Sequence, residues 1–112
     1  MERKVETIFH YKNYCCVILS LEADSALSVF QDHYPERYLC GYVKVPYWHP
    51  MFEKHYNDIP IRCYGGLTFS DRTLLGTNKH GWWIGFDCAH ADDAVNPKDI
   101  NFVIQECKNI VD

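Results

Sequence analysis

The chain has 112 residues, enough for one compact domain but too few for a second hydrophobic core of any size. Hydrophobic residues make up 47% and charged residues 23% of the sequence, a composition that excludes an intrinsically disordered chain. The formal net charge is −4 and no basic cluster extends beyond Arg3 and Lys4, which argues against binding to duplex nucleic acid.

The N-terminal residues predict a β-hairpin. Apolar and polar side chains alternate over residues 5–11, and residues 14–19 form a second run of high β-propensity. Lys12 and Asn13 lie between the two runs, where a tight turn is expected. The two runs therefore pair as neighbouring strands.

A short helix and a third strand are expected next. Asp24 and Ser25 are both good N-cap residues, and Pro35 ends the helix because proline disfavours helical geometry at the residue before it. Residues 38–45 have the composition of a strand, and a loop stiffened by two prolines follows at residues 46–50.

The centre of the chain predicts two further antiparallel strands. All six glycines lie between positions 41 and 85, so the most permissive backbone is concentrated here. Residues 51–56 predict a helical turn, and residues 61–69 and 82–88 predict strands. The connection at residues 70–80 is longer than the usual hairpin loop of about two to five residues, so it forms a flap or holds further structure.

The C-terminal residues predict an amphipathic helix. Asn96 is a good N-cap, Pro97 suits the first helical position, and Asp99 places negative charge near the positive end of the helix dipole. An apolar face recurs at helical spacing: Ile100, Val103, Ile104, Cys107, Ile110 and Val111. We therefore expect residues 1–112 to form a single α+β domain, a mainly antiparallel sheet covered by this helix.

The two central strands also predict a ligand site, because side chains alternate between the faces of a sheet. One face of each strand is apolar, and the other carries polar, aromatic and glycine residues. If these mixed faces lie on the same side, they form an aromatic groove with a floor opened by glycines, beside His49 on the stiffened loop. The predicted ligand-binding residues are Arg62, Tyr64, Gly66, Thr68, Trp83, Gly85, Asp87, His90 and His49.

A structural role is the competing interpretation of the same residues. Trp83 packs under the C-terminal helix in that case, Asp87 and Asp92 cap turns, and His90 bonds a loop carbonyl. Arg72 and Lys79 in the long connection are similarly open, either as cations for an anionic ligand or as solvated surface charges.

Catalysis or metal binding would use the end of the groove. If the protein is an enzyme, Asp87 and His90 are the catalytic candidates, because a carboxylate and an imidazole can orient each other for proton transfer. The metal candidates are His49, Asp87, His90 and Asp92, but no recognised ligand spacing selects three of them. We expect no resident cofactor, with a divalent metal as the alternative.

The compartment is expected to be the cytoplasm. No apolar run approaches the length of about 18 residues that a membrane-spanning helix needs, and residues 1–6 lack the apolar segment of a secretion signal. The six cysteines contain no Cys-x-x-Cys pair, so they are expected to be reduced thiols packed as small hydrophobes.

Three stretches of the sequence resemble a known group of proteins. They are the Gly41-Tyr42-Val43 run continuing to Pro46 and His49-Pro50, the run from Gly65 to Ser70, and the Trp-Trp-Ile-Gly-Phe-Asp-Cys-Ala-His run from Trp82 to His90. With a C-terminal helix they resemble a family of small proteins encoded by bacteriophages and prophages, over most of residues 38–112. The family often has His before the two glycines, where this chain has Tyr64, and this departure counts against a catalytic or metal-binding role there.

The resemblance implies a setting, because the family has no established chemistry. It implies a phage accessory protein in the bacterial host cytoplasm, where such proteins adjust host physiology or counter host defence. One way to do so is to bind and sequester a nucleotide signal. In the predicted groove a base would stack on Trp83 or Tyr64 while Arg62 pairs with a phosphate.

Three functions are therefore expected from the sequence, in order of preference. The first is binding of a small nucleotide-like ligand in the groove. The second is metal-dependent hydrolysis at Asp87 and His90. The third is inhibition of a host enzyme by an acidic surface that includes Asp92 and Asp93, since six acidic residues face only Lys98 and Lys108 after position 86.

Overall fold

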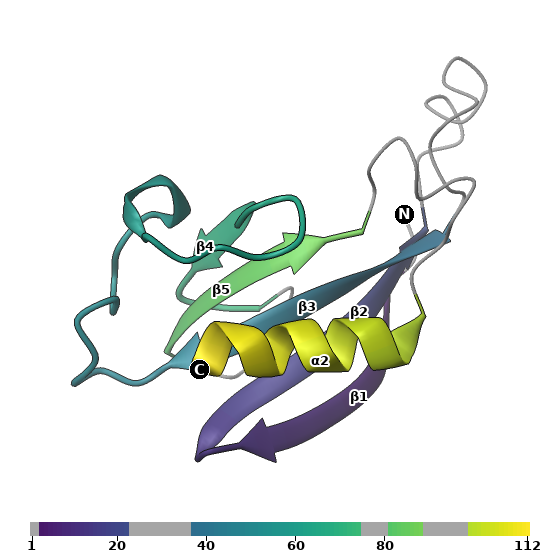
Figure 1. Ribbon diagram of the computed structural model, residues 1–112, viewed down its shortest axis with the longest axis horizontal. Helices are drawn as coiled ribbons and strands as arrows, with labels where there is room; N and C mark the ends of the chain where they lie inside the picture. The colour runs from purple at the N-terminus through teal and green to yellow at the C-terminus, as the bar shows by residue number, and fades with distance from the viewer. Residues whose placement is uncertain (1–2, 23–36, 75–80, 89–98) are drawn as a thin grey trace.

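The computed structural model describes residues 3–22, 37–74, 81–88 and 99–112, and shows a five-stranded antiparallel sheet packed by one helix (Figure 1). The predicted α+β fold class is confirmed. The strands lie in the order β1-β2-β3-β5-β4, and the predicted helix after Asp24 lies outside the described residues. The elements are β1 (Arg3–Tyr11), β2 (Tyr14–Glu22), β3 (Arg37–Val45), the 3-10 helix η1 (Tyr56–Asp58), β4 (Phe69–Asp71), β5 (Trp82–Asp87) and α2 (Ile100–Val111).

The predicted hairpin of β1 and β2 is confirmed. Tyr11 pairs with Tyr14, and the two residues between them have positive φ angles, 50° at Lys12 and 69° at Asn13. Two consecutive left-handed residues are the geometry of a type I′ turn, whose twist matches that of the flanking strands. The pairing register shifts between Val5 and Thr7, so β1 contains an irregularity near its start.

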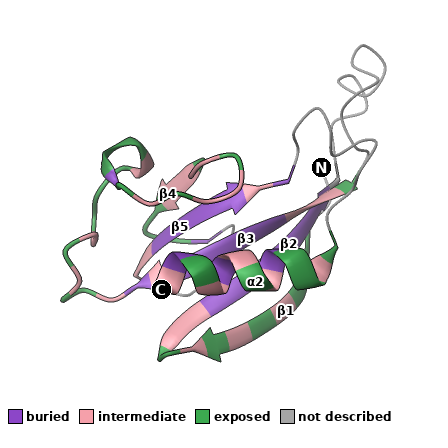
Figure 2. Ribbon diagram, viewed as in Figure 1, coloured by how far each residue is buried: buried purple, intermediate pink, exposed green. Residues whose placement is uncertain are grey.

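Figure 2 shows that buried residues run along β2, β3 and β5, whereas residues 4–11 of β1 are exposed or intermediate. The helix face packs against α2, and its core residues include Ile18, Val43 and Phe86 together with Val103 and Cys107 of the helix. The opposite face has a separate apolar cluster: Val17, Leu19, Leu21, Cys40, Tyr42, Leu74 and Trp83. Both faces of β2, β3 and β5 are therefore buried. Because side chains on both faces are buried, the sequences of these strands are almost continuously apolar.

The C-terminal helix covers the sheet as predicted, but it begins later than expected. Asp99 is the N-cap, because its carboxylate accepts a hydrogen bond from the Phe102 amide at 2.9 Å. The prediction of Asn96 as N-cap is therefore wrong, and Asn96 and Pro97 lie outside the described residues. The apolar face is confirmed: Val103, Cys107 and Ile110 are buried, and Ile100, Ile104 and Val111 pack beside them.

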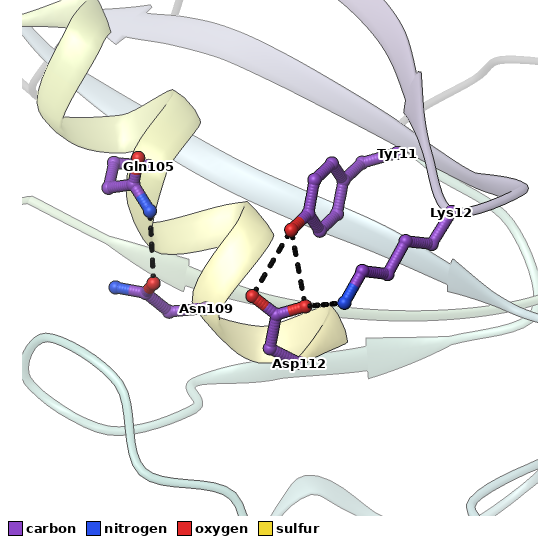
Figure 3. A network of polar contacts seen from close by, with 5 residues as sticks. All are labelled: Tyr11, Lys12, Gln105, Asn109 and Asp112. Carbon is purple, nitrogen blue, oxygen red and sulfur yellow. Dashed lines mark hydrogen bonds and ion pairs between the residues drawn. The ribbon is translucent and has the colours of Figure 1, made fainter.

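The end of α2 is tied to the β1–β2 turn by a polar network (Figure 3). Lys12 Nζ lies 2.5 Å from Asp112 Oδ1, and the Tyr11 hydroxyl donates to both carboxylate oxygens at 3.2 Å. This pairing lowers the pKa of Asp112 and raises that of Lys12. The contact fixes the hairpin turn against the far end of the helix, roughly a hundred residues along the chain.

The predicted strand at residues 61–69 is wrong in most of its length. Only Phe69–Asp71 forms β4, and it pairs with β5 as expected for an antiparallel neighbour. Gly65 and Gly66 have φ angles of 70° and 83°, and the Gly66 amide donates to the Cys63 carbonyl at 2.9 Å, so this stretch is a turn. The helical turn predicted at residues 51–56 occurs instead at η1, Tyr56–Asp58.

Candidate functional site

The turn at residues 63–66 places Tyr64 on the helix face of the sheet. Its backbone amide donates to Glu106 Oε2 of α2 at 2.6 Å, and its ring meets Phe102 edge-on with centroids 5.3 Å apart. Arg62 is exposed, and Gly66 has open space where a Cβ would point. Loss of strand geometry here removes the alternation on which the predicted groove depended.

Trp83 lies on the opposite face and is fully buried, with 0% of its surface exposed. Tyr64 and Trp83 are therefore on different sides of the sheet and do not share a groove. Gly85 does not leave space for a ligand either. A Cβ at Gly85 would lie 2.4 Å from Cδ1 of Tyr42, so the Tyr42 ring already occupies that space. The expectation that Trp83 packs under the helix is also wrong, since it faces away from α2.

Of the remaining predicted site residues, two are in contact with each other and His49 lies apart from them. Thr68 and Asp87 are brought together, since the Thr68 hydroxyl donates to Asp87 Oδ2 at 3.0 Å. His49 packs on the helix face, where its ring meets Tyr14 edge-on at 6.2 Å and its Nδ1 accepts from the Met51 amide at 3.0 Å. His90 and Asp92 lie outside the described residues.

Metal-ligating side chains are not clustered in the described part of the chain. Within residues 3–22, 37–74, 81–88 and 99–112, no group of three His, Cys, Asp or Glu side chains is placed to hold an ion. Of the metal candidates from the sequence, only His49 and Asp87 are described, and they lie on opposite faces of the sheet.

A cavity of about 620 Å³ lies elsewhere, at the end of the sheet beside the β1–β2 turn. This volume is in the range of small-molecule sites. Its wall comes from the hairpin, the end of β3, the loop after β3 and the residues that flank the long connection. The lining residues are His10, Asn13, Cys15, Lys44, Val45, Pro46, Tyr47, Phe52, Arg72 and Gly81.

The hairpin and β3 place three polar groups in this wall. His10 and Cys15 are directly paired across β1 and β2, and Lys44 pairs with Trp83 across β3 and β5. Lys44 is half-buried, and its stem packs on Gly81, where a Cβ would approach Lys44 Cε to 2.5 Å. Gly81 therefore leaves room for the lysine to reach the cavity.

Basic groups dominate the charge of the cavity. His10, Lys44 and Arg72 line it, and none of the described lining side chains is a carboxylate. Arg72 forms an ion pair with Glu53, which is outside the lining, and the carbonyl of Arg72 accepts from the Gly81 amide at 3.3 Å. Cationic side chains such as Lys44 and Arg72 are able to pair with an anion.

Two aromatic side chains line the cavity from the loop after β3. Tyr47 is 81% exposed at the rim, and Phe52 is half-buried. The His49 amide donates to the Pro46 carbonyl and the Phe52 amide to the His49 carbonyl, both at 3.0 Å. These two bonds close successive turns in the backbone that carries Tyr47 and Phe52.

The loop is also anchored from outside. The Trp82 indole donates to the Lys54 carbonyl at 2.8 Å, and the Tyr56 amide donates to Ser70 Oγ of β4 at 3.1 Å. These bonds hold the C-terminal end of the loop, at Lys54 and Tyr56, to β5 and β4.

Cys15 and Cys63 are both half-buried thiols, but only Cys15 lines the cavity. Burial, with the nearby charge of Glu106, raises the pKa of Cys63 to about 11. The other four cysteines are buried, and burial raises the pKa of Cys40 to about 12.

Sequence reasoning missed most of the cavity wall. Of its members, the sequence predicts only Arg72 as a cation for an anionic ligand. Lys44 carried a usable signal, because it is the one charged residue among the apolar residues 38–45. His10 and Tyr47 carried none, since their approach depends on how the hairpin and the loop after β3 come together.

Comparison with protein-family models, with curated proteins and with solved structures finds no match to this chain. No helix in the described residues is long and apolar enough to cross a membrane.

Proposed function

We propose that the protein binds a small nucleotide-like anion in the cavity beside the β1–β2 turn. The observation that carries the proposal is the composition of the cavity wall, in which His10, Lys44 and Arg72 stand beside the rings of Tyr47 and Phe52. A nucleotide presents the two matching groups, a phosphate and a flat base.

Each side chain has a distinct role in this proposal. The guanidinium of Arg72 can pair with two phosphate oxygens, and Lys44 supplies a compact positive charge. The exposed ring of Tyr47 offers a face on which a base stacks, an interaction worth about 1–3 kcal/mol per base. The ligand-binding function expected from the sequence is kept, but its location moves from the predicted groove to this cavity.

The biological setting follows from the sequence resemblance to phage and prophage proteins. We propose a cytoplasmic accessory protein that sequesters a nucleotide signal without converting it, in the manner of a counter-defence factor.

Calorimetric titration with nucleoside monophosphates and triphosphates of the four common bases tests the proposal. We expect saturable binding with one site per chain for at least one of them. Lys44→Ala should weaken it by about ten-fold or more, the cost of losing one charged contact. Arg62→Ala is the matched control, because Arg62 is an exposed cation outside the cavity, and it should leave affinity unchanged.

Two results would count against the proposal. One is the absence of binding by every nucleotide at millimolar concentration. The other is a loss of affinity in Arg62→Ala with none in Lys44→Ala, which would return the site to the region predicted from the sequence.

A further inference from the structure

A row of side chains across three strands places a thiol between two basic groups. His10 of β1 is the cross-strand partner of Cys15 in β2. Cys16 pairs with Val43, and the next position of the same register sets Cys15 opposite Lys44 of β3. Directly opposite residues of an antiparallel pair lie on one face of the sheet, with Cβ atoms about 4.5–5.5 Å apart. His10 and Lys44 therefore flank Cys15 on its two sides.

This row lines the cavity beside the β1–β2 turn. Cys15 packs against the apolar cluster around Trp83, on the face of the sheet away from α2. His10, Cys15 and Lys44 all belong to the cavity wall, and Cys15 is half-buried, so a molecule that enters the cavity can reach its sulfur. All six cysteines lie in the described residues, and of these only Cys15 lines the cavity.

The other half-buried thiol has the opposite charge beside it. Cys63 lies outside the cavity, in the turn closed by the Gly66 amide. Burial and the negative charge of Glu106 raise the pKa of Cys63 to about 11, so its reactive thiolate is scarce at neutral pH. Glu106 also repels an anionic reagent from Cys63, whereas Lys44 attracts one to Cys15. The two thiols therefore differ in which reagents they favour.

We propose that Cys15 is a modification site, at which the disulfide of a small anionic thiol reacts to leave a mixed disulfide in the cavity. This inference goes beyond the proposed function and does not depend on nucleotide binding. Lys44 and Arg72 can pair with carboxylates of such a molecule, and no described side chain of the lining is a carboxylate that would repel it.

The reaction is a thiol–disulfide exchange. The imidazole of His10 accepts the proton of the Cys15 thiol, and the thiolate attacks one sulfur of the small disulfide. A bond forms between Cys15 Sγ and that sulfur as the original disulfide bond breaks, and its electron pair leaves with the second sulfur. The leaving sulfur takes the proton back from the imidazolium. The products are the mixed disulfide and one small thiol, so the small disulfide is the only oxidant.

Mass spectrometry of the full chain, incubated with oxidised glutathione or with cystamine, tests the inference. Oxidised glutathione is an anionic disulfide and cystamine a cationic one. We expect glutathione to modify Cys15 several-fold faster than Cys63, and this preference to be smaller with cystamine. Lys44→Ala should slow the reaction of Cys15 with glutathione by about two- to five-fold, the range of one exposed charge pair, and should not slow the reaction with cystamine. His10→Gln removes the proton acceptor and should slow both reactions several-fold.

Arg62→Ala is the matched control. It removes an exposed cation that neighbours Cys63 and lies outside the cavity, and it should leave the reaction of Cys15 unchanged. Circular dichroism checks that each variant is folded. The inference is overturned if Cys63 reacts with glutathione as fast as Cys15 does. It is also overturned if Lys44→Ala and His10→Gln slow Cys15 no more than Arg62→Ala does.

The outcome is independent of the nucleotide titrations, because no nucleotide is present in these reactions. Modification of Cys15 as expected, in a protein that binds no nucleotide, would support this inference and overturn the proposed function alone. Nucleotide binding that is weakened by Lys44→Ala, in a protein whose Cys15 shows no preference for glutathione, would overturn this inference and leave the proposed function in place.

Discussion

The two faces of the sheet are built from the same strands but are covered differently. On the helix face, α2 lies along β2 and β3, its first turn is capped by Asp99, and its end is held to the hairpin by Asp112. The opposite face has its own apolar cluster around Trp83, and beyond Lys44 it gives way to a cavity with basic groups.

The comparison shows that burial and access to the cavity change from one strand to its neighbour on the same face of the sheet. Trp83 and Lys44 are cross-strand partners, yet the tryptophan is fully buried and the lysine reaches the cavity. We therefore expect substitutions around Trp83 to change stability and substitutions around Lys44 to change binding.

The largest effect on stability is expected at Trp83. Trp83→Ala should lower the free energy of unfolding by about 3–5 kcal/mol, the usual cost of emptying a large core site. Trp48→Ala is the matched control, since that ring is 66% exposed, and it should change stability by no more than about 0.5 kcal/mol. Urea denaturation of both variants makes the comparison, and equal small effects would place Trp83 outside the core.

Two glycines test the close packing of each face. A Cβ at Gly41 would lie 2.8 Å from Cys107 Sγ and 2.6 Å from a Phe86 ring carbon, while one at Gly85 would meet Tyr42 and the Gly41 carbonyl. Alanine at either position should cost about 1–3 kcal/mol, measured by urea denaturation. A neutral Gly85→Ala would mean that the space over Gly85 is open, as the groove predicted from the sequence requires.

The helix cap should have a smaller effect. Asp99→Ala removes the acceptor for the Phe102 amide and should cost about 1 kcal/mol, whereas Asp99→Asn should retain most of the stability because asparagine also caps helices. Thermal unfolding of the two variants separates capping from helix charge. Equal losses in both would show that charge, and not the hydrogen bond, matters here.

The smallest effect on stability is expected at the exposed ion pair between Lys12, in the β1–β2 turn, and Asp112 at the end of α2. Because the pKa of Asp112 is lowered in the folded state from the ordinary 3.8, its contribution to stability is present above 3.8 and is lost as the pH falls through the folded value. The difference in Tm between the wild type and Asp112→Asn should therefore be small at pH 7 and vanish in strong acid. Lys12→Gln should show the same loss at pH 7, and a difference that persisted in acid would contradict the ion-pair explanation.

Local patterns predicted much of the fold. The alternation at residues 5–11, the Lys12-Asn13 turn and the apolar face of α2 are local signals, and the structure contains each of them. The strand predicted at residues 61–69 failed because Gly65 and Gly66 take left-handed angles, and an apolar-polar alternation does not reveal φ. That single error moved Tyr64 to the wrong face.

The candidate site was harder to predict because its wall is assembled from distant segments. His10 and Lys44 come from β1 and β3, and Arg72 directly follows β4. Since β1 and β4 are the two edge strands of the sheet, no local sequence pattern indicates that these residues line one cavity. The predicted groove relied instead on neighbours within two segments. The nucleotide-like ligand stays a prediction from the sequence, and the sequence did not predict the cavity that the structure contains.

Alkylation of two cysteines tests the location of the site most directly. Cys15 lines the cavity, and Cys63 lies between Arg62 and Tyr64 in the region predicted from the sequence; both are half-buried. Each thiol's rate of reaction with iodoacetamide is measured by mass spectrometry with and without saturating 5′-AMP. We predict that the nucleotide slows modification of Cys15 several-fold and leaves Cys63 unchanged. Protection of Cys63 with none at Cys15 would contradict the assignment of the site to the cavity.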